Sequence, residues 1–285
     1  MIKPGWLKTR PPAGTKFQTL NKVLHEYNLN TVCTGSSCPN TGECWSRGAA
    51  ALMIMGNICT RNCRFCAVKK GKKGEPLDPS EPQRLAEAVG KLGLGYVALT
   101  SVDRDDLPDG GAEHFAECIN AIKCHDNTII VEALIPDFQG DAECLGKIIK
   151  ANPDVIGHNI EVVKEFQALA RDRRAGYVLS MEVLKKLREM SSSPHIKSSL
   201  MLGLGETSEM VMCAMGDLRK AGVELLTLGQ YLRPSMKHIE VKEYVSPRKF
   251  AYFKKKAEDM GFLSVVSGPL VRSSYMANSV KIKKV

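Results

Sequence analysis

Cysteines are the residues whose type and spacing most clearly suggest chemistry in this 285-residue chain. The chain contains 10 of them, and six fall between positions 33 and 66. Thiolates are soft ligands for iron and zinc, and crowded cysteines in a reducing compartment indicate metal ligands before disulfides. The six form a loop triplet (Cys59, Cys63 and Cys66) and an N-terminal triplet (Cys33, Cys38 and Cys44).

The loop triplet has the spacing Cys-x3-Cys-x2-Cys and directly follows an apolar segment at 51–56. Three thiolates on one loop can hold three irons of a [4Fe–4S] cube and leave the fourth iron without a protein ligand. An open metal position is where chemistry can occur. Zinc prefers four closed ligands, and the ferredoxin pattern ends in Cys-Pro. Neither alternative matches, so the spacing favours an iron–sulfur cluster with one open iron.

The N-terminal triplet has the spacing Cys-x4-Cys-x5-Cys, again with no fourth cysteine or histidine close by. A zinc site would need a distant fourth ligand, and the odd number disfavours disulfides. A second iron–sulfur cluster is therefore the favoured interpretation, with zinc as the alternative.

Alternating strands and helices are the elements that must position these cysteines. Short apolar runs predict strands at 51–56, 96–101, 128–134, 154–159, 197–203 and 223–229. Helical spacing predicts helices at 81–92, 111–123, 141–151, 161–170, 180–190 and 207–221, with Thr207 as a cap. Pro247 opens a last helix, which a short strand follows. Six strands with right-handed crossovers predict a parallel sheet that curls into an incomplete barrel.

Composition limits the class of protein. Hydrophobic residues make up 44% and charged residues 25%, which is typical of a globular domain. No apolar run approaches the length of a membrane span, and the N-terminus has no apolar signal-peptide core, so we expect a cytoplasmic protein. The net charge of +9 permits an acidic partner. We expect the basic run 69–73 to be a solvated loop. The four remaining cysteines are expected to be small buried residues on helices: Cys118, Cys124, Cys144 and Cys213.

The loop triplet, with Phe65 just before its last cysteine, resembles the signature of the radical S-adenosylmethionine (SAM) superfamily. The resemblance implies a partial (β/α)6 barrel, in agreement with the strand count. It also implies that the open iron chelates SAM, whose cleavage gives methionine and a 5′-deoxyadenosyl radical.

Polar residues at strand ends are candidates for binding SAM, because ligands bind at the carboxyl ends of parallel strands. Asn159 and Glu161 have side chains that suit ribose hydroxyls. Gly203 and Gly205 offer backbone that an adenine can approach closely. Strand-end turns or helix caps are the alternative for each of them. The arginines of the run 171–174 are candidates for the methionyl carboxylate, with an exposed helix end as the alternative.

The N-terminal triplet ahead of the loop triplet, together with the motif Arg-Ser-Ser-Tyr at 272–275, resembles the lipoyl synthase family. Segments such as CPNTGECW, HNIE and LGLGET extend the resemblance over nearly the whole chain. It implies an auxiliary [4Fe–4S] cluster held by the N-terminal triplet and one serine. We assign Ser274, with Ser273 as the second choice. Without the family, the motif would be a polar tail.

The resemblance implies radical insertion of sulfur at C6 and C8 of an octanoyl chain on a lysine of a carrier domain. Both sulfurs would come from the auxiliary cluster, and no general acid or base is assigned. The implied cofactors are two [4Fe–4S] clusters and SAM. The implied partners are octanoylated lipoyl carrier domains and an electron donor such as flavodoxin or ferredoxin, and neither nucleic acid nor a membrane is expected.

We expect an N-terminal extension at 1–48, a radical SAM partial barrel at 49–245 and a C-terminal extension at 246–285. Three other functions compete with a lipoyl synthase. They are a radical SAM enzyme that thiolates transfer RNA, a two-cluster electron carrier and a zinc-stabilised nucleic-acid-binding protein.

Overall fold

The computed structural model describes residues 3–9, 14–47 and 49–274. Its centre is an eight-stranded sheet in which β1 is antiparallel to β2 and every later neighbour is parallel. The strands in sheet order are β1 (Asn30–Thr31), β2 (Ala51–Ile54), β5 (Tyr96–Ser101), β6 (Ile130–Leu134), β7 (Val155–Gly157), β8 (His195–Leu202), β9 (Leu225–Gln230) and β10 (Ser264–Gly268). β1 and β10 are the two ends of this order and do not pair with each other. The expected partial α/β barrel is confirmed.

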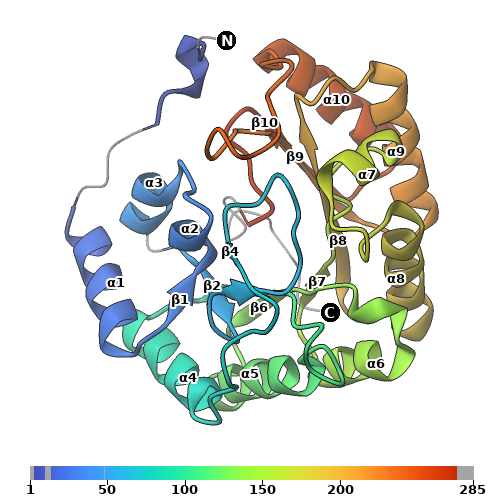
Figure 1. Cartoon of the computed structure of the whole chain (residues 1–285). Helices are drawn as coiled ribbons and strands as arrows, with labels where there is room; N and C mark the ends of the chain where they lie inside the picture. Colours follow the sequence, from blue (N-terminus) through green and yellow to red (C-terminus); the bar gives the residue numbers. More distant parts are fainter. Residues whose placement is uncertain (1–2, 10–13, 48, 275–285) are drawn as a thin grey trace.

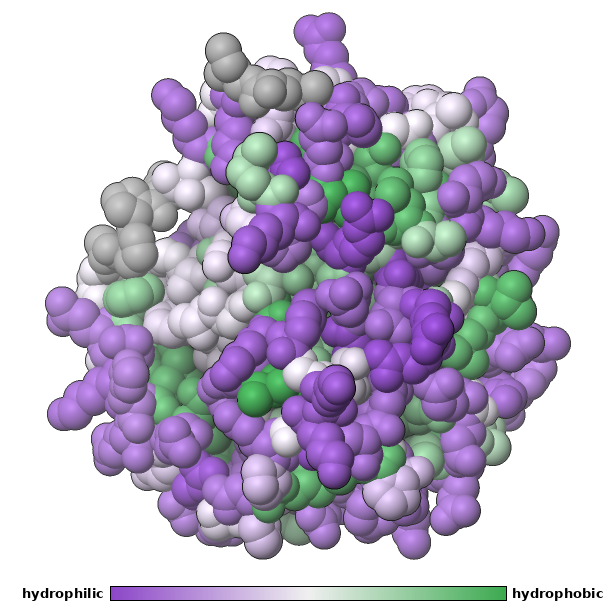
Figure 2. All heavy atoms as spheres, in the orientation of Figure 1, coloured by the Kyte–Doolittle hydropathy of each residue, from purple (hydrophilic) through white to green (hydrophobic). Residues whose placement is uncertain are grey.

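Helices cover the outer side of the sheet, and Figure 1 shows them following the arc of the strands. They are α1 (Thr15–Glu26), α4 (Glu81–Leu92), α5 (Ala112–His125), α6 (Ala142–Lys150), α8 (Tyr177–Met190), α9 (Ser208–Lys220) and α10 (Pro247–Asp259). Because helices lie on one face and side chains fill the other, strands such as β2 and β9 are buried at every position. Hydrophilic residues cover most of the face seen in Figure 2, with smaller groups of hydrophobic residues between them.

Side-chain caps begin several crossover helices where the sequence predicts them. The Thr207 hydroxyl accepts a hydrogen bond from the Met210 N–H at the start of α9. Ser246 caps α10 in the same way, with Pro247 at its first position. Each cap satisfies an N–H that the helix cannot pair internally. The predictions for Thr207 and Pro247 are confirmed.

The helix expected at 161–170 is wrong over its first three residues, 161–163. Glu161 has a positive φ of 65° and forms a bridge with Leu200 of β8. Its N–H donates to the Ser199 carbonyl, and its own carbonyl accepts from the Met201 N–H, so this backbone is already paired with the strand. The helical structure is limited to η3 (Lys164–Phe166) and α7 (Gln167–Ala170).

Two of the four remaining cysteines are not where we expected them. Cys118 and Cys144 are buried on α5 and α6, as predicted, but Cys124 and Cys213 are exposed. Both exposed thiols lie at solvent-accessible positions of α5 and α9, so apolar character alone did not decide their burial.

A buried pair ties the outer helices to the end of β2. Glu81 of α4 accepts hydrogen bonds from the Met55 N–H (3.0 Å) and from His114 of α5 (2.7 Å). Met55 has a positive φ of 65° and begins the segment that leads to the loop triplet. Glu81 therefore holds this turn against the helix layer.

Replacing Glu81 by alanine is expected to lower the free energy of unfolding by about 2 kcal/mol, because it leaves the buried Met55 N–H and His114 without their partner. Urea unfolding of the cluster-free chain measures this loss. Glu87→Ala is the matched control, since Glu87 lies on the same helix but is exposed. Equal stabilities of the two variants would contradict the role of Glu81.

Candidate active site

One cavity of about 830 Å³ lies inside the barrel and is lined by both cysteine triplets. The same cavity is also lined by Asn159, Glu161, Ser273 and Ser274. The sequence separates the triplets from Ser274 by more than 200 residues, and the fold brings them to one space. This is the arrangement that chemistry between two clusters requires.

The loop triplet lies on a segment that begins at β3 (Ile58–Cys59) and returns at β4 (Lys69–Lys70). The Arg64 N–H donates to the Ala170 carbonyl, and the Arg64 carbonyl accepts from the Ile239 N–H. The Asp172 N–H points at the Cys63 sulfur at 3.4 Å. The loop is thus held from several strand ends, which suits a site that must keep three thiolates in place.

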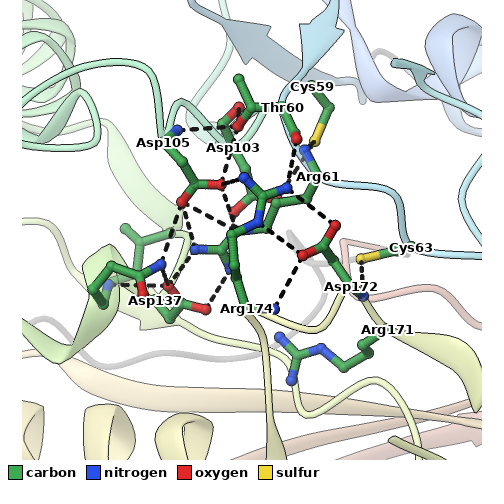
Figure 3. A network of polar contacts seen from close by, with 12 residues as sticks. Cys59, Thr60, Arg61, Cys63, Asp103, Asp105, Asp137, Arg171, Asp172 and Arg174 are labelled. Carbon is green, nitrogen blue, oxygen red and sulfur yellow. Dashed lines mark hydrogen bonds and ion pairs between the residues drawn. The ribbon is translucent and has the colours of Figure 1, made fainter. Parts of the chain in front are cut away.

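Arg61 sits inside this loop and binds aspartates that follow two neighbouring strands, as Figure 3 shows. Its guanidinium donates to Asp105 (2.8 Å), after β5, and to Asp137 (2.7 Å), after β6. Burial opposes the charge of Arg61, but these carboxylates keep its pKa above the ordinary value. Burial likewise works to raise the pKa of Asp137, and the bond from Arg61 outweighs it and lowers that pKa. Arg61 and Asp137 are therefore both charged, and their ion pair fixes the loop of Cys59, Cys63 and Cys66 over the barrel.

A second ion pair holds the outer side of the loop. Asp172 accepts hydrogen bonds from Arg174 (2.9 Å) and from the Asn62 N–H (2.8 Å). Arg174 also donates to the Thr60 carbonyl (2.7 Å). The hydrogen bond from Arg174 lowers the pKa of Asp172. Arg174, one of the three candidates for a carboxylate ligand, is therefore engaged with the protein itself.

Burial raises the pKa of several thiols of the two triplets. It brings Cys59, beside Asp103, to about 12, Cys63 to about 11 and Cys44 to about 12. Metal ligands must be thiolates, so binding a cluster releases protons from these groups.

The spacing of the sulfur atoms distinguishes a cube from a single ion. Tetrahedral zinc, with Zn–S bonds of about 2.3 Å, brings its sulfurs to about 4 Å from one another. In the described part of the chain, Glu81, His114 and Cys118 form the one group whose ligand atoms all lie within 4.8 Å. Neither triplet is that tight, although each lines the cavity. The donor sets therefore fit a larger multi-iron cluster better than one zinc ion.

The N-terminal triplet lies on two short helices, α2 (Val32–Gly35) and α3 (Thr41–Ser46), and the turn between them. The Cys38 N–H donates to the Cys33 carbonyl (2.9 Å), and the Thr41 hydroxyl donates to the Cys38 carbonyl (2.8 Å). These bonds use only backbone atoms of the cysteines. Burial raises the pKa of the Cys38 thiol, but the backbone N–H of Asn40 reaches its sulfur and acts to lower that pKa, which favours the thiolate that a metal needs.

Two long-range hydrogen bonds hold the serine segment, one to the segment of the N-terminal triplet and one to β9. The Asn40 amide donates to the Leu270 carbonyl (2.5 Å). Arg272 donates to the Gln230 carbonyl (3.1 Å) at the end of β9. Ser273 and Ser274 consequently reach the cavity wall. The last residue of the motif, Tyr275, lies outside the described residues.

Of the predicted SAM contacts, two line the cavity and two do not. The Asn159 amide donates to Glu161 (3.0 Å), and burial raises the pKa of Glu161. Arg171 also lines the cavity, and its Nε atom is buried without a hydrogen-bond partner in the described chain. Gly203 and Gly205 lie outside the cavity lining. A Cβ on Gly203 would meet the Glu243 carbonyl oxygen at 2.5 Å, so packing already requires a glycine there.

Sequence reasoning missed the residues that position the site. Arg61, Asp137 and Asn40 act through pairings that span 76 to 230 positions. That these charged and polar side chains are buried and paired can be seen only in the folded structure. A charged residue within the cysteine loop was the one signal available for Arg61.

Comparison with known proteins identifies the family. A model of the Radical SAM superfamily matches residues 53–218. Lipoyl synthases from Halobacterium salinarum and Natronomonas pharaonis are 52% and 50% identical over 99% of this chain and 92% of their own lengths. That of Thermus thermophilus is 50% identical over 98% of this chain and 86% of its own length.

Solved structures agree on the fold. The FeFe-hydrogenase maturase HydG from Carboxydothermus hydrogenoformans superposes with a TM-score of 0.57 at 13% identity, over 94% of this chain and 74% of its own. Methylornithine synthase superposes with a TM-score of 0.57 at 11% identity, over 82% of this chain and 77% of its own. At such identities the likeness concerns the barrel alone. The sequence relatives carry the assignment further, and by them this chain belongs to the lipoyl synthase family of radical SAM enzymes.

Proposed function

We propose that this chain inserts two sulfur atoms, at C6 and C8, into an octanoyl chain bound to a lysine of a carrier protein. The observation that carries the proposal is the single cavity lined by both cysteine triplets and Ser274. Clusters held by the two triplets would both reach an alkyl chain bound in that cavity. Unactivated C–H bonds are beyond acid–base chemistry, so such a reaction needs a cofactor radical.

The loop triplet would hold a [4Fe–4S] cluster with one open iron, and the N-terminal triplet would hold an auxiliary cluster. When bound, these groups and SAM supply the radical that removes hydrogen and the sulfur that replaces it. The protein supplies placement. Arg61 and Arg174 fix the loop, Asn159 and Glu161 suit the SAM ribose, and the buried Nε of Arg171 is a donor for the methionyl carboxylate. The glycines Gly203 and Gly205 stay a prediction as SAM contacts.

The three parts of the chain would divide this work. Residues 1–48 carry the auxiliary cysteines, residues 49–245 the barrel, and residues 246–285 the serine motif. The bond from Asn40 supports this division because it joins the two extensions, and the bond from Arg272 ties the C-terminal extension to the barrel.

Anaerobic incubation with dithionite, SAM and an octanoylated peptide tests the function. Mass spectrometry is expected to find a peptide that has gained two sulfur atoms. Cleavage of SAM without any sulfur transfer, in protein with both clusters loaded, would refute the proposal. Transfer RNA, offered in place of the peptide, is expected to gain no sulfur.

Ser274 is the proposed fourth ligand of the auxiliary cluster, and replacing it by cysteine is expected to keep the cluster but slow sulfur insertion at least tenfold. An alkoxide is a harder ligand than a thiolate, so it releases iron more readily when a sulfide leaves. Iron analysis and single-turnover product measurement check the two halves of the prediction. Ser273→Cys is the matched control, and an unimpaired Ser274→Cys enzyme would defeat the idea.

The carrier would dock through charge. The chain has a net charge of +9, which complements an acidic carrier domain and an acidic electron donor such as flavodoxin or ferredoxin. Raising the salt concentration from about 0.05 to 0.5 M is expected to weaken carrier binding about tenfold or more, because exposed charges are screened. Calorimetric titration at both concentrations measures this, and an unchanged affinity would argue against electrostatic docking.

No helix in the described part of the chain is long and apolar enough to cross a membrane. The cytoplasmic location and the absence of a nucleic-acid partner stay predictions.

A further inference from the structure

Lys70 differs from the other lysines of the basic run 69–73. That run was expected to be a solvated loop, and Lys69, Lys72 and Lys73 are indeed exposed. Lys70 instead lines the central cavity. Its ammonium nitrogen is buried and has no hydrogen-bond partner among the described residues. The expectation is wrong at this one position.

The backbone explains why Lys70 points inward. Lys70 is the register partner of Cys59 in the short β3–β4 pair, and the Gly71 N–H donates to the Cys59 carbonyl (3.0 Å). Side chains alternate along a strand, so neighbours such as Lys69 and Lys70 face opposite ways. Cys59 and Lys70 therefore approach the cavity together.

The charge of Lys70 reaches the sulfur of Cys59. Burial dominates the raised pKa of that thiol, and the ammonium acts in the opposite direction and lowers it. Asp103, whose charge acts on the same thiol, is already used by Arg61 (3.4 Å) and the Cys59 thiol (3.5 Å).

A buried ammonium without a partner is costly, so its presence indicates an anion that enters the cavity. A cube held by three thiolates is anionic, and it gains one further negative charge when it is reduced. A neighbouring positive charge stabilises the reduced form more than the oxidised form.

We propose that the Lys70 ammonium lies against the cluster of the loop triplet and raises its midpoint potential. The inference rests on the proposed function, because it needs that cluster at Cys59, Cys63 and Cys66. The step is the uptake of one electron from an external low-potential donor of the flavodoxin or ferredoxin class. Lys70 transfers neither proton nor electron, and it shifts only the equilibrium of that reduction.

An anaerobic redox titration of the holoenzyme, followed by electron paramagnetic resonance, tests the proposal. The signal that changes when SAM is added belongs to the cluster with the open iron. Lys70→Met is expected to lower the equilibrium constant of its reduction about tenfold, which is about 59 mV for one electron. Lys70→Arg keeps the charge and is expected to retain most of the potential. Lys69→Met is the exposed control and is expected to change nothing.

Three outcomes overturn the proposal while leaving the function intact. One is an unchanged potential in Lys70→Met with a full iron content. Another is a shift that appears only after SAM is added, which would assign Lys70 to the SAM carboxylate. The third is an equal shift in Lys70→Met and Lys70→Arg, since arginine keeps the positive charge. Failure of the parent protein to load any cluster at the loop triplet would instead refute the proposed function.

Discussion

Replacing Cys38 by alanine is expected to abolish sulfur insertion while SAM cleavage continues at close to its original rate. Cys38 belongs to the N-terminal triplet, and the proposed radical chemistry starts at the loop triplet on another part of the wall. The substitution is structurally mild because the Cys38 backbone makes the local hydrogen bonds and its side chain is only partly buried. Loss of function would therefore reflect loss of a cluster ligand.

Iron analysis, 5′-deoxyadenosine release and sulfur insertion measure the three consequences separately. The parent is expected to hold about eight irons and Cys38→Ala about four. Cys63→Ala is expected to lose both SAM cleavage and sulfur insertion. Cys213→Ala, with an exposed thiol on α9, is expected to lose neither. Sulfur insertion by Cys38→Ala would contradict a sulfur-donating cluster at the N-terminal triplet.

The barrel could be predicted because its signal is local. Segments such as 96–101 and 223–229 are short and mostly apolar, as strands buried on both faces need to be. The helices between them carry an apolar stripe at helical spacing. The strands that were missed, β1, β3 and β4, contain two residues each, and a period cannot be read from two residues.

The cysteine ligands could be predicted from spacing, but their meeting in one cavity could not. The three cysteines of each triplet lie close together in the sequence, so their spacing alone predicts that they bind a metal cluster. The approach of residues 33–44 to the segment of Ser274 depends on the hydrogen bond from Asn40 to Leu270, while Arg272 ties that segment to Gln230 of β9. Such tertiary hydrogen bonds leave no periodic trace in the chain. Without the family, the serine motif would have remained a polar tail.

Lys70 shows the limit of composition arguments most clearly. A run of lysines predicts solvent exposure, and the two-residue strand β4 reverses that prediction for one of its members. Gly203 shows the converse case, because a glycine expected for cofactor approach is already required by the Glu243 carbonyl and a φ of 110°. Backbone position decides what these residues do.

Replacing Arg61 by methionine is the second substitution with a large expected effect. It is expected to cost about 3–5 kcal/mol of folding free energy, because it leaves Asp137, which has no exposed surface, as an unpaired buried charge. It also removes the bond between the loop triplet and the strand end after β6. A displacement of about 1 Å at a reacting group can cost about 100-fold in rate, so we expect a SAM cleavage loss of that order.

A second variant separates stability from positioning. Arg61→Met combined with Asp137→Asn removes the unpaired charge, and the amide oxygen of the introduced asparagine can still accept the hydrogen bond that Asp137 takes from the Gln139 N–H. This double variant is expected to recover most of the unfolding free energy in urea but to keep the slow SAM cleavage, since the loop stays untied. Arg64→Met, at an exposed position of the same loop, is the control. If the double variant recovers both the unfolding free energy and the rate of SAM cleavage, Arg61 serves stability alone. If Arg61→Met changes neither quantity, the role proposed for the ion-pair network is wrong.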